Sequence, residues 1–187
     1  MKGHAPMIMF VSIILFALAA CGTESRPNED SNGTADKPDS FEFQIAKDGF
    51  IYKLYTEKDK YTVSEEISIM AELAYAGELE AVTIIHGEPL LAFALEEKTR
   101  SVKLDMPIRE IAKTRTLKKG ETIVESFNHS QLQPAADDKS SRTFLELVKK
   151  QGFPAGDYAI FGRAVFFMQE EEKHVELNGA IQFSVAD

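Results

Sequence analysis

The sequence predicts a mainly β protein, an antiparallel β-sandwich with one short helix. From Phe41 onward, apolar and β-branched residues recur in short runs, several of them with a period of two. Turn signals rich in Gly, Pro and Asp separate these runs at short intervals. Eight or nine such strands beside a single helical stretch are typical of a sandwich.

The strands follow one another along residues 41–187. Asp48-Gly49 is the first turn, Gly87-Glu88-Pro89 is expected to end a strand, and Gly179 is expected to mark a bulge. Residues 101–116 give the weakest pattern. Strands are expected over 41–45, 50–56, 67–75 (which 61–63 lead into), 81–86, 90–96, 102–106, 122–127, 159–168 and 175–185.

The one predicted helix follows the polar loop 128–140. Ser140-Ser141 is expected to cap its start, and Gly152 to close it in the left-handed conformation before Pro154 stops it. Lys149-Lys150 suits the negative end of the helix dipole. Its apolar stripe consists of Phe144, Leu145, Leu147 and Val148.

Residues 1–20 have the three parts of a secretory signal peptide. Lys2 gives a positive start, residues 7–18 are continuously apolar, and small residues follow at 19–20. Counted through Ala20, the apolar run is roughly 14 residues, short of the ~20 that cross a bilayer as a helix. A cleaved signal is therefore favoured over a permanent span.

Leu18-Ala-Ala-Cys21-Gly22 resembles a bacterial lipobox. The resemblance implies cleavage between Ala20 and Cys21 and a lipid with acyl chains, such as palmitate, on the Cys21 thiol. Two acyl chains anchor a protein stably. The implied location is the extracytoplasmic face of the cell membrane, and the alternative is a plain secreted protein whose cysteine falls there by chance.

Residues 21–40 hold no large apolar residue and are rich in Pro, Gly, Ser, Asn and Asp. Such a segment cannot bury enough surface to offset its ordering entropy, so it is predicted to be a disordered tether. The expected organisation is a signal peptide over 1–20, the lipidated Cys21 and tether over 21–40, and a β-sandwich domain over 41–187.

The net negative charge of the chain limits the classes of molecule that it is expected to bind. It has 21 Lys and Arg against 30 Asp and Glu, a formal charge of −9, and cleavage would remove one Lys and no acid. This balance argues against nucleic acid as a partner, because a general phosphate field would repel the protein. We expect the lipid to hold it at the membrane, and its partner to be an envelope or secreted protein.

The sequence shows no arrangement typical of catalysis, a cofactor or a metal. Cys21 is the only cysteine, and His86, His129 and His174 stand at no metal-ligand spacing. Paired acids such as Glu96-Glu97 point to opposite faces of a strand and do not converge. Residues 170–172 are expected to be a solvated hairpin tip, with weak calcium binding as the alternative.

Three stretches are similar to one family of bacterial modules. They are Tyr61-Thr-Val-Ser-Glu-Glu-Ile, Leu117-Lys-Lys-Gly-Glu and Phe153-Pro-Ala-Gly-Asp-Tyr158. Their order and spacing resemble the intracellular proteinase inhibitor (BsuPI-like) group. The resemblance implies an immunoglobulin-like sandwich over about residues 50–185 and raises protease inhibition as a function. Tyr158 is expected to be a structural corner tyrosine rather than a binding residue.

These observations predict a non-catalytic, immunoglobulin-like binding module held at the membrane by a lipid anchor and a tether. Exposed sheet edges and loops suit protein contact. The two alternatives are an extracytoplasmic protease inhibitor or regulator, and a carrier of a small ligand or metal.

Overall fold

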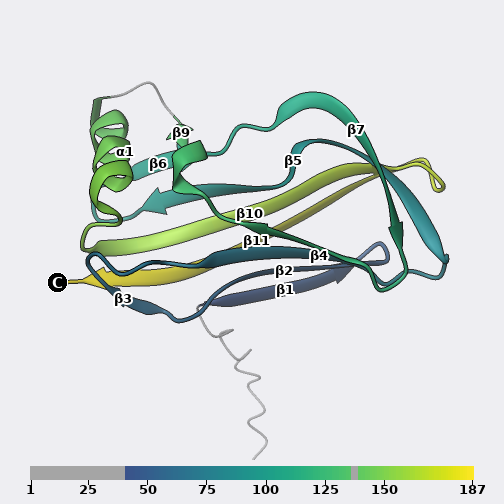
Figure 1. The fold of residues 1–187 in the computed structure, drawn as a ribbon, viewed down its shortest axis with the longest axis horizontal. Helices are drawn as coiled ribbons and strands as arrows, with labels where there is room; N and C mark the ends of the chain where they lie inside the picture. The colour runs from purple at the N-terminus through teal and green to yellow at the C-terminus, as the bar shows by residue number, and fades with distance from the viewer. Residues whose placement is uncertain (1–40, 136–138) are drawn as a thin grey trace, which may run out of the picture. The chain divides into compact units, whose positions relative to one another are not determined.

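The computed structural model describes residues 41–135 and 139–187, which form two packed β-sheets and one α-helix (Figure 1). This confirms the predicted fold class. Ala20 and Cys21, together with the expected signal peptide and tether, lie outside the described residues. No helix in the described ranges is both long and apolar enough to cross a membrane.

The first sheet is antiparallel and has the strand order β1-β2-β4-β8. Asp48 and Gly49 join its first two strands with positive φ angles of 54° and 77°, the geometry of a tight hairpin. The strands are β1 (Glu42–Lys47), β2 (Phe50–Thr56), β4 (Ile69–Tyr75) and β8 (Thr122–Ser126).

The second sheet has the order β3-β11-β10-β5-β6-β9, and β7 also pairs with β5. Only the β3–β11 pair is parallel among the described strands. The strands are β3 (Lys60–Thr62), β5 (Ala81–Glu97), β6 (Val102–Asp105), β7 (Arg109–Lys118), β9 (Gln133–Pro134), β10 (Gly156–Met168) and β11 (Lys173–Ala186).

Aromatic residues fill the space between the sheets. Phe50 of β2 meets Phe166 of β10 edge to face, with ring centroids 4.7 Å apart. Tyr158 and Phe183 stack at 5.1 Å. On β11, alternate apolar residues are buried, namely Val175, Leu177, Ile181, Phe183 and Val185.

A pair of glycines lets the two sheets approach closely. Gly162 and Gly179 lie opposite each other on β10 and β11. A Cβ on Gly162 would stand 2.1 Å from the Tyr52 hydroxyl oxygen, and one on Gly179 would stand 2.3 Å from the Phe43 ring. The register is continuous through Gly179, so the predicted bulge there is wrong; the glycine instead makes room for an aromatic ring.

Helix α1 (Lys139–Gln151) packs against β6 and β9 at one end of the sandwich (Figure 1). Gly152 follows it with a φ of 79°, as predicted. Of the predicted stripe, Leu147 is only half-buried, whereas Phe144, Leu145 and Val148 are buried. Ser140 and Ser141 lie inside the first turn, so the prediction that they precede and cap the helix is wrong. A short 3₁₀ turn (His129–Gln131) stands in the preceding loop.

Tyr158 is a corner tyrosine, as predicted. Its hydroxyl donates a 2.5 Å hydrogen bond to the carbonyl oxygen of Pro154, four residues upstream. The buried ring stacks on Phe183, so the residue joins the corner to the core.

Residues 81–97 form one strand, so the predicted break at Gly87-Glu88-Pro89 is wrong. The chain passes through this segment as a register shift rather than an end. Strand β7 was not predicted, because all of its residues except Leu117 are exposed and its charged sequence carries no apolar alternation. The short strands β3 and β9 are further additions to the predicted set, and the described residues hold eleven strands.

Candidate functional site

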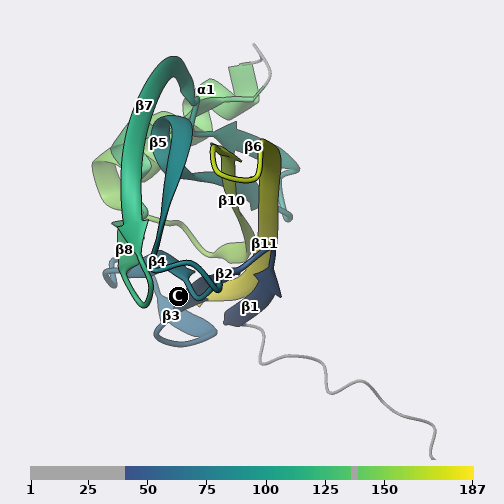
Figure 2. The same cartoon turned by 90° about the vertical axis from the view of Figure 1, so that its right-hand side faces the viewer.

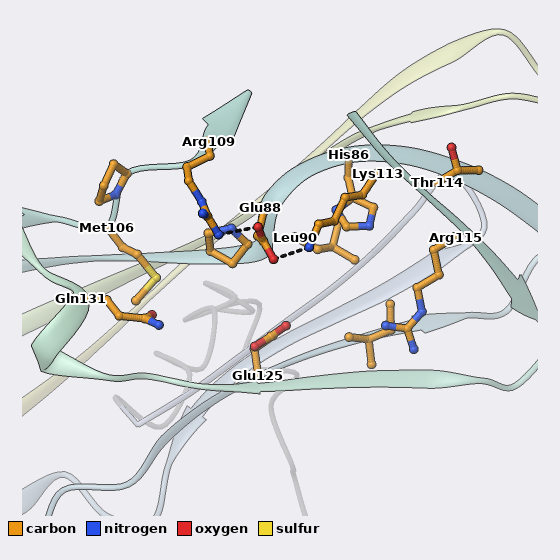
Figure 3. A pocket seen from close by; sticks show the side chains of 13 residues that line it. His86, Glu88, Leu90, Met106, Arg109, Lys113, Thr114, Arg115, Glu125 and Gln131 are labelled. Atoms are coloured by element: carbon orange, nitrogen blue, oxygen red, sulfur yellow. Dashed lines mark hydrogen bonds and ion pairs between the residues drawn. The ribbon is translucent and has the colours of Figure 1, made fainter. Parts of the chain in front are cut away.

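A cavity of about 670 Å³ lies between β5, β7 and β8 (Figure 3). This volume is in the range of small-molecule sites in proteins. Its lining combines basic, acidic and apolar side chains from both sheets: His86, Glu88, Pro89, Leu90, Met106, Pro107, Arg109, Lys113, Thr114, Arg115, Ile123, Glu125 and Gln131.

The irregular pairing of β5 with β7 shapes one wall of the cavity. His86 pairs with Lys113 and Glu88 pairs with Arg109, so a single residue of β5 opposes three residues of β7. A Cβ on Gly87 would stand 2.5 Å from the Ile108 side chain and 2.9 Å from the Arg109 carbonyl oxygen. Gly87 therefore lets β7 cross close to β5 rather than ending the strand.

Two basic side chains of β7 occupy the face of the strand that points into the sandwich. Leu117 is fully buried, and successive side chains of a strand alternate between its faces. Arg115 and Lys113 therefore share the face of Leu117, and both line the cavity. Figure 3 shows Arg115 on the cavity side of the strand, with Thr114 projecting from its other side.

Glu88 of β5 forms ion pairs with two basic side chains of β7. Its carboxylate forms ion pairs with Lys113 and Arg109, each through a different oxygen (Figure 3). The hydrogen bond from Lys113, and then the charges of Arg109 and Lys113, hold the pKa of Glu88 below its ordinary value. Glu88 is therefore a permanent anion near neutral pH and fixes two cations at the rim.

The opposite wall carries an acid at a core-facing position. On β8, Ile123 is buried and Phe127, just beyond the strand, packs against the core, so Glu125 between them also faces inward. Glu125 is half-buried and lines the cavity. Within the described ranges it has neither a hydrogen-bond nor an ion-pair partner. The fold thus leaves this inward carboxylate open to a cationic group of a ligand.

Apolar side chains form the rest of the cavity. Leu90, Met106 and Ile123 are each at least 95% buried and contribute to its lining. The cavity thus offers a cationic wall on β7, an anionic group on β8 and an apolar base. This arrangement suits binding of a molecule with both polar and apolar parts.

The three histidines of the domain have different surroundings. His86 lines the cavity in mid-strand, with its Nδ1 2.6 Å from the Gly87 carbonyl oxygen. His129 stands near the Phe153 ring and His174 near the Phe167 ring. Among the described residues, no group of three or more His, Cys, Asp or Glu side chains is arranged to hold a metal ion.

The acidic hairpin tip and the corner at Pro154 both have partners within the fold. At the acidic tip 170–172, the Thr83 backbone N–H donates a bifurcated hydrogen bond to the two carboxylate oxygens of Glu170, with N···O distances of 2.8 and 2.9 Å. Pro154 accepts the corner hydrogen bond of Tyr158. Glu96 and Glu97 point to opposite faces, as predicted, with Glu97 fully buried.

Sequence reasoning missed the cavity, although signals for it are present. Glu125 interrupts the apolar face of a predicted strand between Ile123 and Phe127. Lys113 and Arg115 precede Leu117 at intervals of two residues. Polar residues on a face that should be apolar indicate a functional position.

No protein-family model matches the chain, and no curated protein matches it. One solved structure with similarity is the crystal structure of Spo0M, a sporulation control protein from Bacillus subtilis. It shares 12% identity over 76% of this chain and 51% of that one, with a TM-score of 0.35, so the chain spans about half the length of that protein. The resemblance to the BsuPI-like group stays a prediction.

Proposed function

We propose that this protein is a non-catalytic binding module, displayed at the extracytoplasmic face of the cell membrane by a lipid on Cys21. The observation that carries the proposal is the cavity between β5, β7 and β8, which charged side chains line from two strands. Lys113 and Arg115 share the face of the buried Leu117 on β7, and Glu125 shares the face of the buried Ile123 on β8, so cationic and anionic groups line one common space.

The lining of the cavity supports binding rather than catalysis. It includes no Ser or Cys nucleophile. Glu88 is engaged by two cations that keep it ionised, so it is poorly suited to donate or take up a proton near neutral pH. The imidazole of His86 is engaged at Nδ1 by the carbonyl of its neighbour Gly87.

The location rests on the residues around Cys21, whose order resembles a lipobox. The acidic balance of the chain supports an envelope or secreted partner rather than nucleic acid. Protease inhibition stays a prediction from the family resemblance, whereas the cavity volume favours carriage of a small ligand.

Site-specific photo-cross-linking in living bacteria tests this proposal. A photoreactive phenylalanine analogue replaces Gln131, an exposed residue of the cavity lining, in the full-length protein. The matched control carries the analogue at Lys103, an exposed residue of β6 outside the lining. A Cys21→Ser version of each protein lacks the lipid anchor.

We expect adducts, detected as mass shifts of the intact protein, from position 131 of the anchored protein and not from position 103. The mass of the adduct distinguishes a protein partner from a small ligand. Equal adducts at both positions, or none above background at position 131, would contradict a binding role for the cavity. Adducts that persist unchanged in the Cys21→Ser protein would contradict the need for an anchor.

A further inference from the structure

We propose that the cavity between β5, β7 and β8 binds a small zwitterion whose two charged ends are joined by an apolar body. A short peptide with free termini and aliphatic side chains fits this description best. This inference rests on the proposed function and names the ligand class of the same site. Three features of the lining carry it: a cationic wall, an unpartnered carboxylate and an apolar base.

The cationic wall fits a carboxylate. Lys113 and Arg115 are two residues apart on one face of β7, which places their Cα atoms roughly 7 Å apart. Long basic side chains at this spacing can converge on one anionic group, and arginine binds carboxylates through two parallel hydrogen bonds. The ligand therefore carries an anionic end toward β7.

The partners that these cations already have leave room for a ligand anion. Arg115 reaches Glu121 at 3.4 Å, and both side chains are partly exposed, so this ion pair is weak and exchangeable. Lys113 shares Glu88 with Arg109, which keeps that carboxylate engaged if Lys113 turns toward a ligand. Figure 2 shows β7 on the outer side of β5, and among the described strands it pairs with β5 alone.

The carboxylate of Glu125 requires the opposite group. It projects from the β8 wall into the same cavity, below the basic side chains of β7 (Figure 3). Because Glu125 has no partner among the described residues, a ligand ammonium group would supply the hydrogen bonds that this inward carboxylate lacks. An anion alone would leave Glu125 unpaired and face its repulsion.

The apolar base determines the body of the ligand. Leu90, Met106 and Ile123 offer aliphatic and thioether surface between the two charged walls. A cavity of about 670 Å³ exceeds what a single amino acid fills and accommodates a short peptide with aliphatic side chains. Capture of free chain termini is a known mode of peptide recognition.

Calorimetric titration of the full-length lipidated protein in nanodiscs, with empty nanodiscs subtracted, tests the inference. The probe is trileucine. Trileucine amide lacks the carboxylate, N-acetyl-trileucine lacks the ammonium group, and free leucine presents both groups on one residue. We expect trileucine to bind, and each capped peptide to bind about tenfold more weakly or worse, because each loses hydrogen bonds to a charged group.

Three variants assign each end of the peptide to its wall. Glu125→Gln should abolish the preference for trileucine over its N-acetyl form and keep the preference over its amide. Arg115→Gln should do the reverse. Lys118→Gln, on the outward face of the same strand, is the matched control and should bind like the parent. Thermal melts of all variants verify folding.

The outcomes separate the ligand class from the proposed function. Equal binding of the capped peptides, or an equal loss with Lys118→Gln, would overturn the zwitterion. So would the absence of heat with trileucine and leucine; a cavity-specific adduct in the cross-linking experiment would then leave the binding module standing. Binding of leucine as tight as that of trileucine, with the same dependence on Glu125 and Arg115, would support the zwitterion and assign the free amino acid as its source.

Discussion

Two carboxylates occupy core-facing positions in this sandwich, and their surroundings differ. Glu97, at the end of β5, is fully buried and accepts hydrogen bonds from the backbone amides of Thr99 and Arg100 at 3.1 and 2.6 Å. The Arg100 guanidinium lies 3.1 Å from it and also donates to the Ala155 carbonyl oxygen. Glu125, on β8, has no partner in the described ranges.

The difference separates an acid whose hydrogen bonds are satisfied within the fold from one that the fold leaves without a partner among the described residues. Glu97 ties the turn after β5 to the segment that leads into β10, so its burial is offset by bonds within the fold. Glu125 gains nothing comparable from the fold. A charge placed inward without compensation is expected where a ligand supplies the missing partner.

The largest effect is expected from Glu97→Ala. The substitution removes a buried carboxylate and leaves the Thr99 and Arg100 amides unpaired, so we expect the free energy of unfolding to fall by about 3 kcal/mol. Denaturant unfolding measures this loss. Glu96→Ala is the matched control on the outer face of the same strand, with an expected change within about 0.5 kcal/mol. Similar losses for both would refute the structural role of Glu97.

A smaller loss of unfolding free energy is expected from Gly162→Ala, which tests the packing around a second polar group without a partner. Tyr52 Oη is the one buried side-chain polar atom without a partner in the described residues, and burial raises its pKa. It fits only because Gly162 has no side chain. We expect Gly162→Ala to cost about 2 kcal/mol through overpacking. Tyr52→Phe should be nearly neutral and recover part of that loss; no recovery in the double variant would contradict this packing.

Glu125→Leu should act in the opposite direction. Replacing an unpartnered inward carboxylate with an apolar side chain should raise the free energy of unfolding by up to about 1 kcal/mol, while binding at the cavity is lost. Denaturant unfolding and the trileucine titration measure the two effects. A clear loss of stability would show that Glu125 supports the fold and not a ligand.

The smallest effect concerns Glu88 and appears only in acid. The pKa of Glu88 in the folded protein lies below its ordinary value of 4.5, so its ion pairs contribute stability above about pH 4.5. That contribution is lost as the pH falls further and the carboxylate takes up a proton. We therefore expect Glu88→Gln to be slightly less stable than the parent near neutral pH, with the gap closing in acid. A gap that widens in acid would contradict the assigned ion pairs.

The regular part of the sandwich was predictable because burial imposes a period on the sequence. The alternation of β2 and β4 reflects one face turned to the core, and Gly152 and Tyr158 stand where helix-end and corner geometry require them. Gly179 could not be assigned correctly, because the reason for that glycine is a ring from another strand, Phe43.

The cavity was not predictable by the same rule. Residues of β7 line the cavity on one face and are exposed on the other, so no apolar period marks the strand. Gly87-Glu88-Pro89 has the composition of a strand end, and only its pairing with Arg109 keeps the strand continuous. Glu125, between Ile123 and Phe127 on a predicted strand, is the local signal of the site, whereas the β7 side of the cavity depends on strand pairing that local sequence does not encode.

The parallel pairing of β3 with β11 also sets the order in which the chain can fold. Lys60, Tyr61 and Thr62 find their partners at Ser184, Val185 and Ala186, more than 120 residues downstream. Strand β3 therefore cannot pair until β11 is available, and contacts so distant in sequence slow folding. A chain threaded through a membrane from its N-terminus would complete this sheet only after residue 186 had emerged, and until then its strand edges would need protection from aggregation.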